Sequence, residues 1–140
     1  MRQIIPILSL LMLLSCSKES RFVRQIEGSW SLDRMQVTDG QLVQHVLEDA
    51  NGSLDLNFAD ATSEGFTDFY LNINAQLFLF SVQFQGEDLR YVPDSDELIM
   101  GAGDERMQYK VILQTKKDLV LEYYDALNFQ LRKFVFIKEE

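Results

Sequence analysis

Apolar residues alternate with polar residues along most of the chain after Glu27, and this two-residue period constrains the fold more than any other feature. Successive side chains of a strand point to opposite faces, so such alternation is typical of strands with one buried face. The apolar members of these runs are Trp30 and Leu32; Leu54, Leu56 and Phe58; Phe78, Phe80, Val82 and Phe84; Met107, Tyr109, Val111 and Leu113; Leu119, Leu121 and Tyr123; and Leu127, Phe129 and Leu131. The sequence therefore predicts an all-β fold.

Turn-forming residues separate these runs. The turn signals are Asp39-Gly40, Asn51-Gly52, Gln85-Gly86, Pro93-Asp94, Gly101-Ala102-Gly103 and Lys116-Lys117-Asp118. Their spacing of about ten residues suits hairpins rather than crossover helices, and it predicts a small antiparallel up-and-down barrel. Residues 41–50 stay open between one short helix and a strand, because their apolar residues recur at helical spacing. The apolar phase shifts after Leu131, which predicts a bulge near Arg132 or Lys133.

The segment Ile26-Glu27-Gly28-Ser29-Trp30-Ser31-Leu32 resembles the Gly-x-Trp opening strand of lipocalin-like domains. Glycine lets the chain enter a barrel closely, and an indole closes that end, so the resemblance gives Gly28 and Trp30 structural roles. Lipocalins often pack a basic side chain of the last strand on this tryptophan. Arg132 and Lys133 are the candidates for that cation–π contact.

The C-terminal half resembles the same class of protein. Residues 109–121, with an apolar strand, a threonine, a polar turn and a Leu-x-Leu strand, look like the penultimate hairpin of small bacterial lipocalin-like lipoproteins. The strand from Leu131 to Lys138 ends in the Phe-x-Phe-x-Lys manner of those proteins. Together the resemblances imply a lipocalin-like β domain over residues 26–138.

A competing resemblance is to the small periplasmic META-type domain. That domain shares the Gly-x-Trp-x-Leu start and a strand like Leu54-x-Leu-x-Phe58 before a glycine such as Gly65. Its usual Gly-Cys-Asn segment is absent, because Phe66-Thr67-Asp68 follows Gly65. The lipocalin-like interpretation is favoured, and the META-like alternative implies a solid core.

The first sixteen residues resemble a bacterial lipoprotein signal. Arg2 supplies one positive charge, and Ile4–Leu14 is apolar except for Pro6 and Ser9. This stretch is shorter than the about 20 residues that span a bilayer, so it is interpreted as a signal peptide. Leu13-Leu14-Ser15-Cys16 resembles the lipobox, which implies cleavage after residue 15 and a covalent lipid on Cys16. Two or more acyl chains hold a protein at a membrane essentially permanently.

The predicted division is therefore a signal peptide over residues 1–15, a lipidated N-terminus and tether over residues 16–25, and the β domain. Ser17 is not the aspartate that commonly retains lipoproteins of Gram-negative bacteria in the inner membrane. The resemblance thus favours the outer membrane over the inner one. It leaves the periplasmic and the surface face of the envelope both open.

The charge of the chain excludes one class of partner. Removal of residues 1–15 leaves 12 Lys and Arg against 22 Asp and Glu, a net charge of −10. Such a surface repels nucleic acid and anionic headgroups, so the lipid on Cys16 rather than charge must provide membrane attachment. Cys16 is the only cysteine, so an intramolecular disulfide is excluded.

No catalytic or metal-binding pattern is recognisable in the sequence. A surface or half-buried position is the ordinary interpretation of the one histidine, His45, and the chain lacks a Gly-x-Ser-x-Gly elbow. The acidic turns Asp94–Glu97 and Asp104-Glu105 lack the EF-hand pattern, and solvated carboxylates are the ordinary interpretation. We therefore predict no enzymatic activity, no cofactor and no metal.

Two functions remain. Phe78, Phe80 and Phe84 share one strand face and are the candidates to line a cavity for a small hydrophobic ligand. In that case the domain is a lipid-anchored binding module of the cell envelope. If the same residues fill a solid core, the domain is a non-enzymatic structural or interaction subunit of an envelope assembly, with a protein as its partner.

Overall fold

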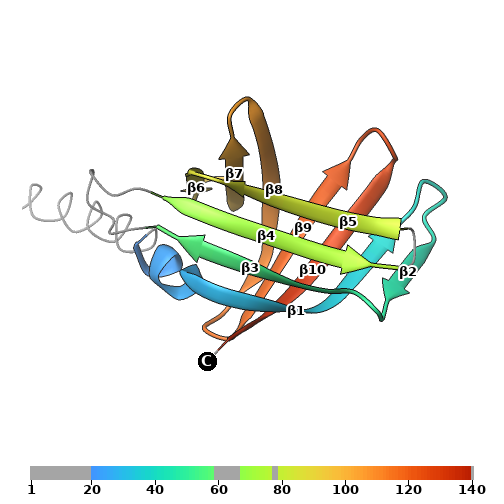
Figure 1. The fold of residues 1–140 in the computed structure, drawn as a ribbon, viewed down its shortest axis with the longest axis horizontal. Helices are drawn as coiled ribbons and strands as arrows, with labels where there is room; N and C mark the ends of the chain where they lie inside the picture. The colour runs from blue at the N-terminus through green and yellow to red at the C-terminus, as the bar shows by residue number, and fades with distance from the viewer. Residues whose placement is uncertain (1–19, 59–66, 77–78, 140) are drawn as a thin grey trace, which may run out of the picture.

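The computed structural model describes residues 20–58, 67–76 and 79–139, which form a short helix over residues 20–26 and one ten-stranded antiparallel sheet (Figure 1). The strands are β1 (Gly28–Thr38), β2 (Gln44–Leu47), β3 (Asn51–Asn57), β4 (Asp68–Ala75), β5 (Phe80–Gly86), β6 (Asp88–Val92), β7 (Glu97–Ala102), β8 (Glu105–Gln114), β9 (Asp118–Asp125) and β10 (Gln130–Lys138). The fold is thus an antiparallel up-and-down barrel of lipocalin-like type with one short helix, and the predicted fold class is confirmed.

The strand order is β5-β4-β3-β1-β10-β9-β8-β7-β6, with β2 also paired to β1. The first and last strands are therefore neighbours, as closure of a barrel requires. β3 pairs with the first half of β1, where Gly28 lies opposite Leu56, and β2 pairs with its second half, where Thr38 lies opposite Gln44. β3 and β2 thus pair one after the other with the same edge of β1.

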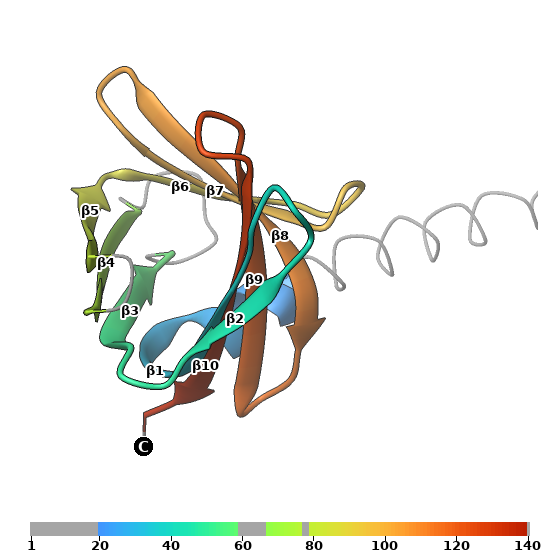
Figure 2. The same cartoon turned by 90° about the vertical axis from the view of Figure 1, so that its right-hand side faces the viewer.

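β5 and β6 link the two ends of this sheet. Only Glu87 separates them, yet β5 pairs with β4 while β6 pairs with β7. The two strands therefore behave as one bent strand that joins the halves of the barrel (Figure 2). Gly86, at the bend, lies against β7: a Cβ there would be 2.2 Å from the carbonyl oxygen of Gly101. The predicted turn at Gln85-Gly86 is instead this close contact between strands.

Two further expectations are settled by the strand pairing. Residues 41–50, left open between helix and strand, contain β2 and no helix. The predicted bulge near Arg132 or Lys133 is wrong, because β10 keeps a regular register with β9. The irregularity lies in β1, between Leu32 and Arg34, where Asp33 is the extra residue against β10. The phase shift in β10 arises because Leu131 points outward and is 37% exposed.

The structured domain begins before the predicted boundary at residue 26. The helix over residues 20–26 lies within the range predicted as a tether, and its Phe22 and Ile26 are both buried in the core. The Phe22 ring also stacks on Tyr91 of β6, with centroids 3.6 Å apart. The helix is therefore a part of the fold, because it contributes apolar side chains that the barrel needs to cover its own interior.

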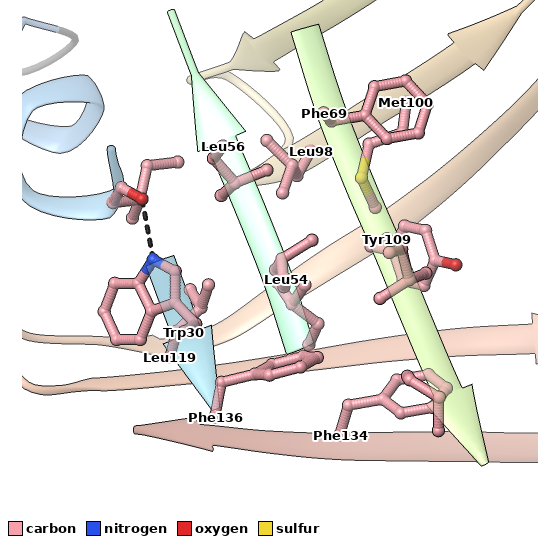
Figure 3. Packing of buried hydrophobic residues seen from close by; sticks show 14 of the residues in the cluster. Trp30, Leu54, Leu56, Phe69, Leu98, Met100, Tyr109, Leu119, Phe134 and Phe136 are labelled. Carbon is pink, nitrogen blue, oxygen red and sulfur yellow. Dashed lines mark hydrogen bonds between the residues drawn. The ribbon is translucent and has the colours of Figure 1, made fainter. Parts of the chain in front are cut away.

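The core lies between the strands, and its members come from every part of the barrel. Trp30, Leu54, Leu119 and Phe136 are fully buried and meet near the helix (Figure 3). All buried core residues of the described ranges lie between Phe22 and Phe136. A chain that starts at Ser17 therefore contains every core residue that the structure describes.

Candidate functional site at the open end of the barrel

The helix over residues 20–26 covers one end of the barrel, which we call the closed end. The opposite end, formed by the β1–β2 turn, the β9–β10 turn and the ends of β4 and β5, is called the open end (Figures 1 and 2). The two ends carry different kinds of contacts. The closed end holds the sequence-predicted structural residues, and the open end holds the candidate binding site.

Trp30 closes its end of the barrel through contacts with Ile26 and Lys138. Its Nε1–H donates to the carbonyl oxygen of Ile26 at 2.8 Å, at the end of the helix. The Nζ of Lys138 lies 4.8 Å from the indole centroid and donates to the carbonyl oxygens of Gln25, at 3.1 Å, and Glu27. A cation at these carbonyls complements the negative end of a helix. Burial lowers the pKa of Lys138.

The basic residue on the tryptophan is thus Lys138, and the expectation of Arg132 or Lys133 is wrong. Trp30 lies opposite Lys138 in the β1–β10 register, whereas Lys133 lies opposite Gln36 and Arg132 opposite Val37. Those two residues are therefore near the other end of the strand pair. The class of contact that the lipocalin resemblance implies is present, with a different residue of the same strand.

Gly28 is required for this arrangement. Its φ of +121° is disfavoured for residues with a side chain. A Cβ at this position would also lie 3.1 Å from Lys138 Nζ. The glycine therefore lets the lysine pass the backbone and reach the end of the helix.

Arg132 occupies the inner face of β10 near the open end. It shares a face with buried Phe134 and Phe136, and only 13% of its side chain is exposed. Its Nη2 donates to Asp125 Oδ2 at 2.8 Å and to Gln130 Oε1 at 3.3 Å. The guanidinium carbon lies 4.7 Å from the ring centroid of Phe80, the first residue of β5. The open end therefore carries a cation between a carboxylate and an aromatic ring.

The Nε of Arg132 is the unusual atom of this site. It is buried and has no hydrogen-bond partner among the described residues. Unsatisfied buried donors are rare in folded proteins and cost about 1–3 kcal/mol each, more for a charged group. Part of the hydrogen-bonding capacity of Arg132 is thus unused in this structure.

Asp125 is held by the β9–β10 turn as well as by Arg132. Its Oδ1 accepts hydrogen bonds from the backbone N–H groups of Leu127, at 3.1 Å, and Asn128, at 3.3 Å. Its Oδ2 accepts a hydrogen bond from Asn128 Nδ2 at 2.7 Å, in addition to the one from Arg132 Nη2. The hydrogen bond from the Asn128 side chain, the other donors of the turn and the nearby guanidinium lower the pKa of Asp125.

Two tyrosines extend the site toward the core. Tyr109 is almost fully buried, and its ring centroid lies 5.3 Å from that of Tyr123 and 6.2 Å from that of Phe134. Burial, and secondarily the proximity of Tyr123, raises the pKa of Tyr109. Among the described residues, the Tyr109 hydroxyl has the Met107 sulfur, at 3.5 Å, as its hydrogen-bond partner. The interior below Arg132 is thus aromatic and weakly polar.

The predicted ligand-lining residues have different outcomes. Phe80 lies at the site beneath Arg132, and Phe84 lies on the same face of β5, where its ring packs 5.0 Å from that of Phe69. Both are half-buried and pack against the core. Phe78 and Cys16 lie outside the described residues. Sequence reasoning placed Arg132 or Lys133 on Trp30 and did not predict the contacts of Arg132 with Phe80 and Asp125, although the spacing Arg132-x-Phe134-x-Phe136 does put Arg132 on the buried face.

His45 belongs to a different strand from Arg132. It lies in β2 and its Nε2 is 3.1 Å from Asp39 Oδ2, beside the β1–β2 turn. Within the ranges that the structure describes, no three His, Cys, Asp or Glu side chains are grouped so that they could hold a metal ion. The helix over residues 20–26 is too short to cross a bilayer, and no other described helix qualifies.

Comparisons with known proteins give little beyond this geometry. No family model matches the chain, and no curated protein matches its sequence. Among solved structures, the chain is similar to one described as "Bovine Odorant Binding Protein deswapped triple mutant". The similarity covers 82% of this chain and 74% of that one, at 13% identity and a TM-score of 0.44. The lipocalin-like assignment therefore rests on the strand order and pairing of the chain itself.

Proposed function

We propose that the chain is a lipid-anchored lipoprotein of the cell envelope, whose barrel binds a small hydrophobic ligand through its open end, without enzymatic activity. The observation that carries the proposal is the unequal burial of the inward-facing apolar side chains. Trp30, Leu119 and Phe136 at the closed end are fully buried, whereas Phe80 and Tyr123 remain partly exposed. Partly exposed apolar surface is therefore present at the open end, where a ligand would cover it.

This exposed interior surface gives binding a driving force. Each Å² of apolar surface removed from water contributes about 25 cal/mol. On β5, Phe80, Val82 and Phe84 are all partly exposed on one face. None of the described strands pairs with the edge of β5 away from β4. A ligand on this face would cover aromatic and aliphatic side chains together, as small-molecule sites commonly require.

The proposed anchor sets the orientation of the barrel. Cys16 precedes the helix start at residue 20 by four residues, which span at most about 14 Å even when fully extended. A lipid on Cys16 would therefore keep the closed end next to the membrane. The open end would then face the aqueous space, which supports ligand exchange from that side.

Ligand binding is tested on the chain that starts at Ser17, purified without detergent. Native mass spectrometry should find a co-purified hydrophobic molecule, or the protein should bind a neutral apolar fluorophore such as N-phenyl-naphthylamine. Phe80→Asp should abolish binding, while Leu79→Asp should retain it, because Leu79 is 91% exposed and points away from the interior. A protein that is isolated empty and does not bind the fluorophore would refute this function.

The anchor is tested separately. We expect the native chain to be found in the membrane fraction and to carry acyl chains on Cys16. Cys16→Ala should give an unprocessed or soluble exported protein. A processed Cys16→Ala protein that remains attached to membranes would overturn the anchor, and fractionation of inner from outer membranes tests the preferred outer-membrane location.

The second candidate function, an interaction subunit of an envelope assembly, is favoured by one surface feature. The β1–β2 and β9–β10 turns present Leu42, 85% exposed, and Leu127, 91% exposed. Between the turns lies a groove of about 440 Å³ whose apolar lining includes Leu42, Tyr124, Phe129 and Leu131. Cross-linking in intact cells tests it, because recovery of no protein partner would count against an interaction role.

A further inference from the structure

The unused hydrogen-bonding capacity of Arg132 indicates the kind of ligand head that the open end would accept. A guanidinium carries five N–H donors and no acceptor. The hydrogen bonds of Arg132 to Asp125 and Gln130 both come from Nη2, and Nε has no acceptor among the described residues. An acceptor oxygen on a bound molecule would use a donor that the described residues leave unpaired.

The carboxylate of Asp125 disfavours a negatively charged oxygen at this position. Arg132 and Asp125 already form a neutral pair, and Asp125 accepts three further hydrogen bonds from its own turn, which hold it in place as an anion. None of the buried residues of the described ranges is charged or polar, so no second cation stands in the core behind the pair. An anionic head would add a second negative charge beside Asp125, in a protein that is strongly acidic overall.

The side chains around Arg132 indicate that the remainder of the ligand is apolar. The Phe80 ring lies beneath the guanidinium. The half-buried Tyr123 lies opposite Arg132 in the β9–β10 register, its ring contacts that of Tyr109, and the Tyr109 ring contacts that of Phe134. These groups offer apolar and aromatic surface directly next to the polar position. A molecule with an oxygen at one end and a hydrocarbon chain behind it would match both.

We propose that Arg132 binds the head of a neutral amphiphile, an alcohol, ester or ketone oxygen on a hydrocarbon chain, which accepts a hydrogen bond from the guanidinium while the chain covers Phe80. The inference rests on the proposed ligand-binding function and names its ligand class. Asp125 acts as a positioning residue, because it fixes the guanidinium through Nη2 and offsets its charge.

The experiment compares three probes that share one chain length: dodecanol, dodecane and dodecanoate. Each is titrated against N-phenyl-naphthylamine bound to the chain that starts at Ser17. Native protein should bind dodecanol about tenfold more tightly than dodecane, the gain expected of one hydrogen bond from a charged donor. Dodecanoate should bind no more tightly than dodecanol.

Arg132→Met should remove the preference for dodecanol over dodecane, since methionine retains an apolar stem without a donor. Lys133→Met is the matched control, because it removes the same charge from the adjacent residue on the outer face of β10 and should leave the preference unchanged. Arg132→Lys, which keeps the charge and loses the planar fork, provides a second variant if Arg132→Met does not fold.

The outcomes separate this inference from the function on which it rests. If native protein binds none of the probes, the ligand-binding function itself fails. If it binds dodecanol and dodecane equally, or if Arg132→Met keeps the preference, binding stands and the role of Arg132 is refuted. If dodecanoate binds tenfold more tightly than dodecanol, the neutral head is refuted and the site is one for carboxylates.

Discussion

Replacement of Gly28 by alanine tests how the closed end is built. The φ of +121° at Gly28 has to be kept, because this residue starts β1 directly after the helix. Holding a residue with a side chain in such a region costs about 1–3 kcal/mol. The new Cβ would also lie 3.1 Å from Lys138 Nζ and 3.3 Å from its Cε. We therefore expect the lysine to move.

Displacement of Lys138 adds to the cost. Its Nζ would lose hydrogen bonds to the carbonyl oxygens of Gln25 and Glu27 and its place over Trp30. A net cost of about 1 kcal/mol for these partly exposed contacts is reasonable. Gly28→Ala should therefore destabilise the fold by about 3 kcal/mol, which corresponds to a fall in Tm of roughly 10 °C for a domain of this size.

The assay is urea denaturation followed by tryptophan fluorescence, because Trp30 is the only tryptophan and lies at the perturbed end. Gly103→Ala is the matched control: its φ is +61° and no atom lies within 4 Å of the added Cβ, so it should cost only about 1 kcal/mol. Gly28→Ala in a Lys138→Met background should recover part of the difference. Equal costs for the two glycine variants, or no coupling to Lys138, would refute this account of the closed end.

Three further predictions concern other parts of the barrel. Trp30→Phe should lower the free energy of unfolding by about 2–3 kcal/mol in urea titrations, because the Ile26 carbonyl loses its donor and a void is left; an unchanged midpoint would contradict this. Gly86→Ala places a Cβ 2.2 Å from a backbone oxygen and should cost about 3 kcal/mol or prevent folding. Gly101→Ala meets only flexible side chains, at 3.3 Å, and should cost less than about 1 kcal/mol by the same measurement. Asp125 has a folded pKa below 3.8, so its ionised form stabilises the fold above that pH and the effect is lost as pH falls through the lowered value. Asp125→Asn should therefore be less stable than the native protein at neutral pH, and the difference should shrink in acid; a difference independent of pH would count against the turn contacts.

The strands could be predicted from the sequence because their inner faces are almost wholly apolar. In β4, for example, Phe69, Leu71, Ile73 and Ala75 are buried at every second position. Residues 41–50 could not be assigned in the same way. Of the apolar residues that recur there at helical spacing, Leu42 is largely exposed and only Leu47 is buried, so their spacing does not reflect contact with the core. Apolar periodicity predicts structure only where the core imposes it.

The pairing of strands explains what the sequence could not determine. A phase shift in β10 could be recognised along the chain, but which of two paired strands holds the extra residue depends on register. With the irregularity at Asp33 in β1, Lys138 and not Arg132 comes opposite Trp30. The type of contact on the indole was therefore predictable, whereas its residue was not. The same holds for the open end: the alternation along β5 predicts the face on which Phe80 lies, but Arg132, which contacts its ring, belongs to a strand far away in sequence.

The inner face of β10 carries two partly buried cations, Arg132 and Lys138, with Phe134 and Phe136 between them. Lys138 is used within the fold, since it contacts two carbonyl oxygens and the Trp30 indole. Arg132 is used only in part, because its buried Nε lacks an acceptor. Removal of one partner of a buried ion pair is costly, and Asp125 would keep only the donors of its turn. Substitution of Lys138 should therefore change stability without changing the preference among ligands, whereas substitution of Arg132 should change both. Under the proposed binding function, the two cations of this strand therefore have different roles, Lys138 in the fold and Arg132 at the ligand.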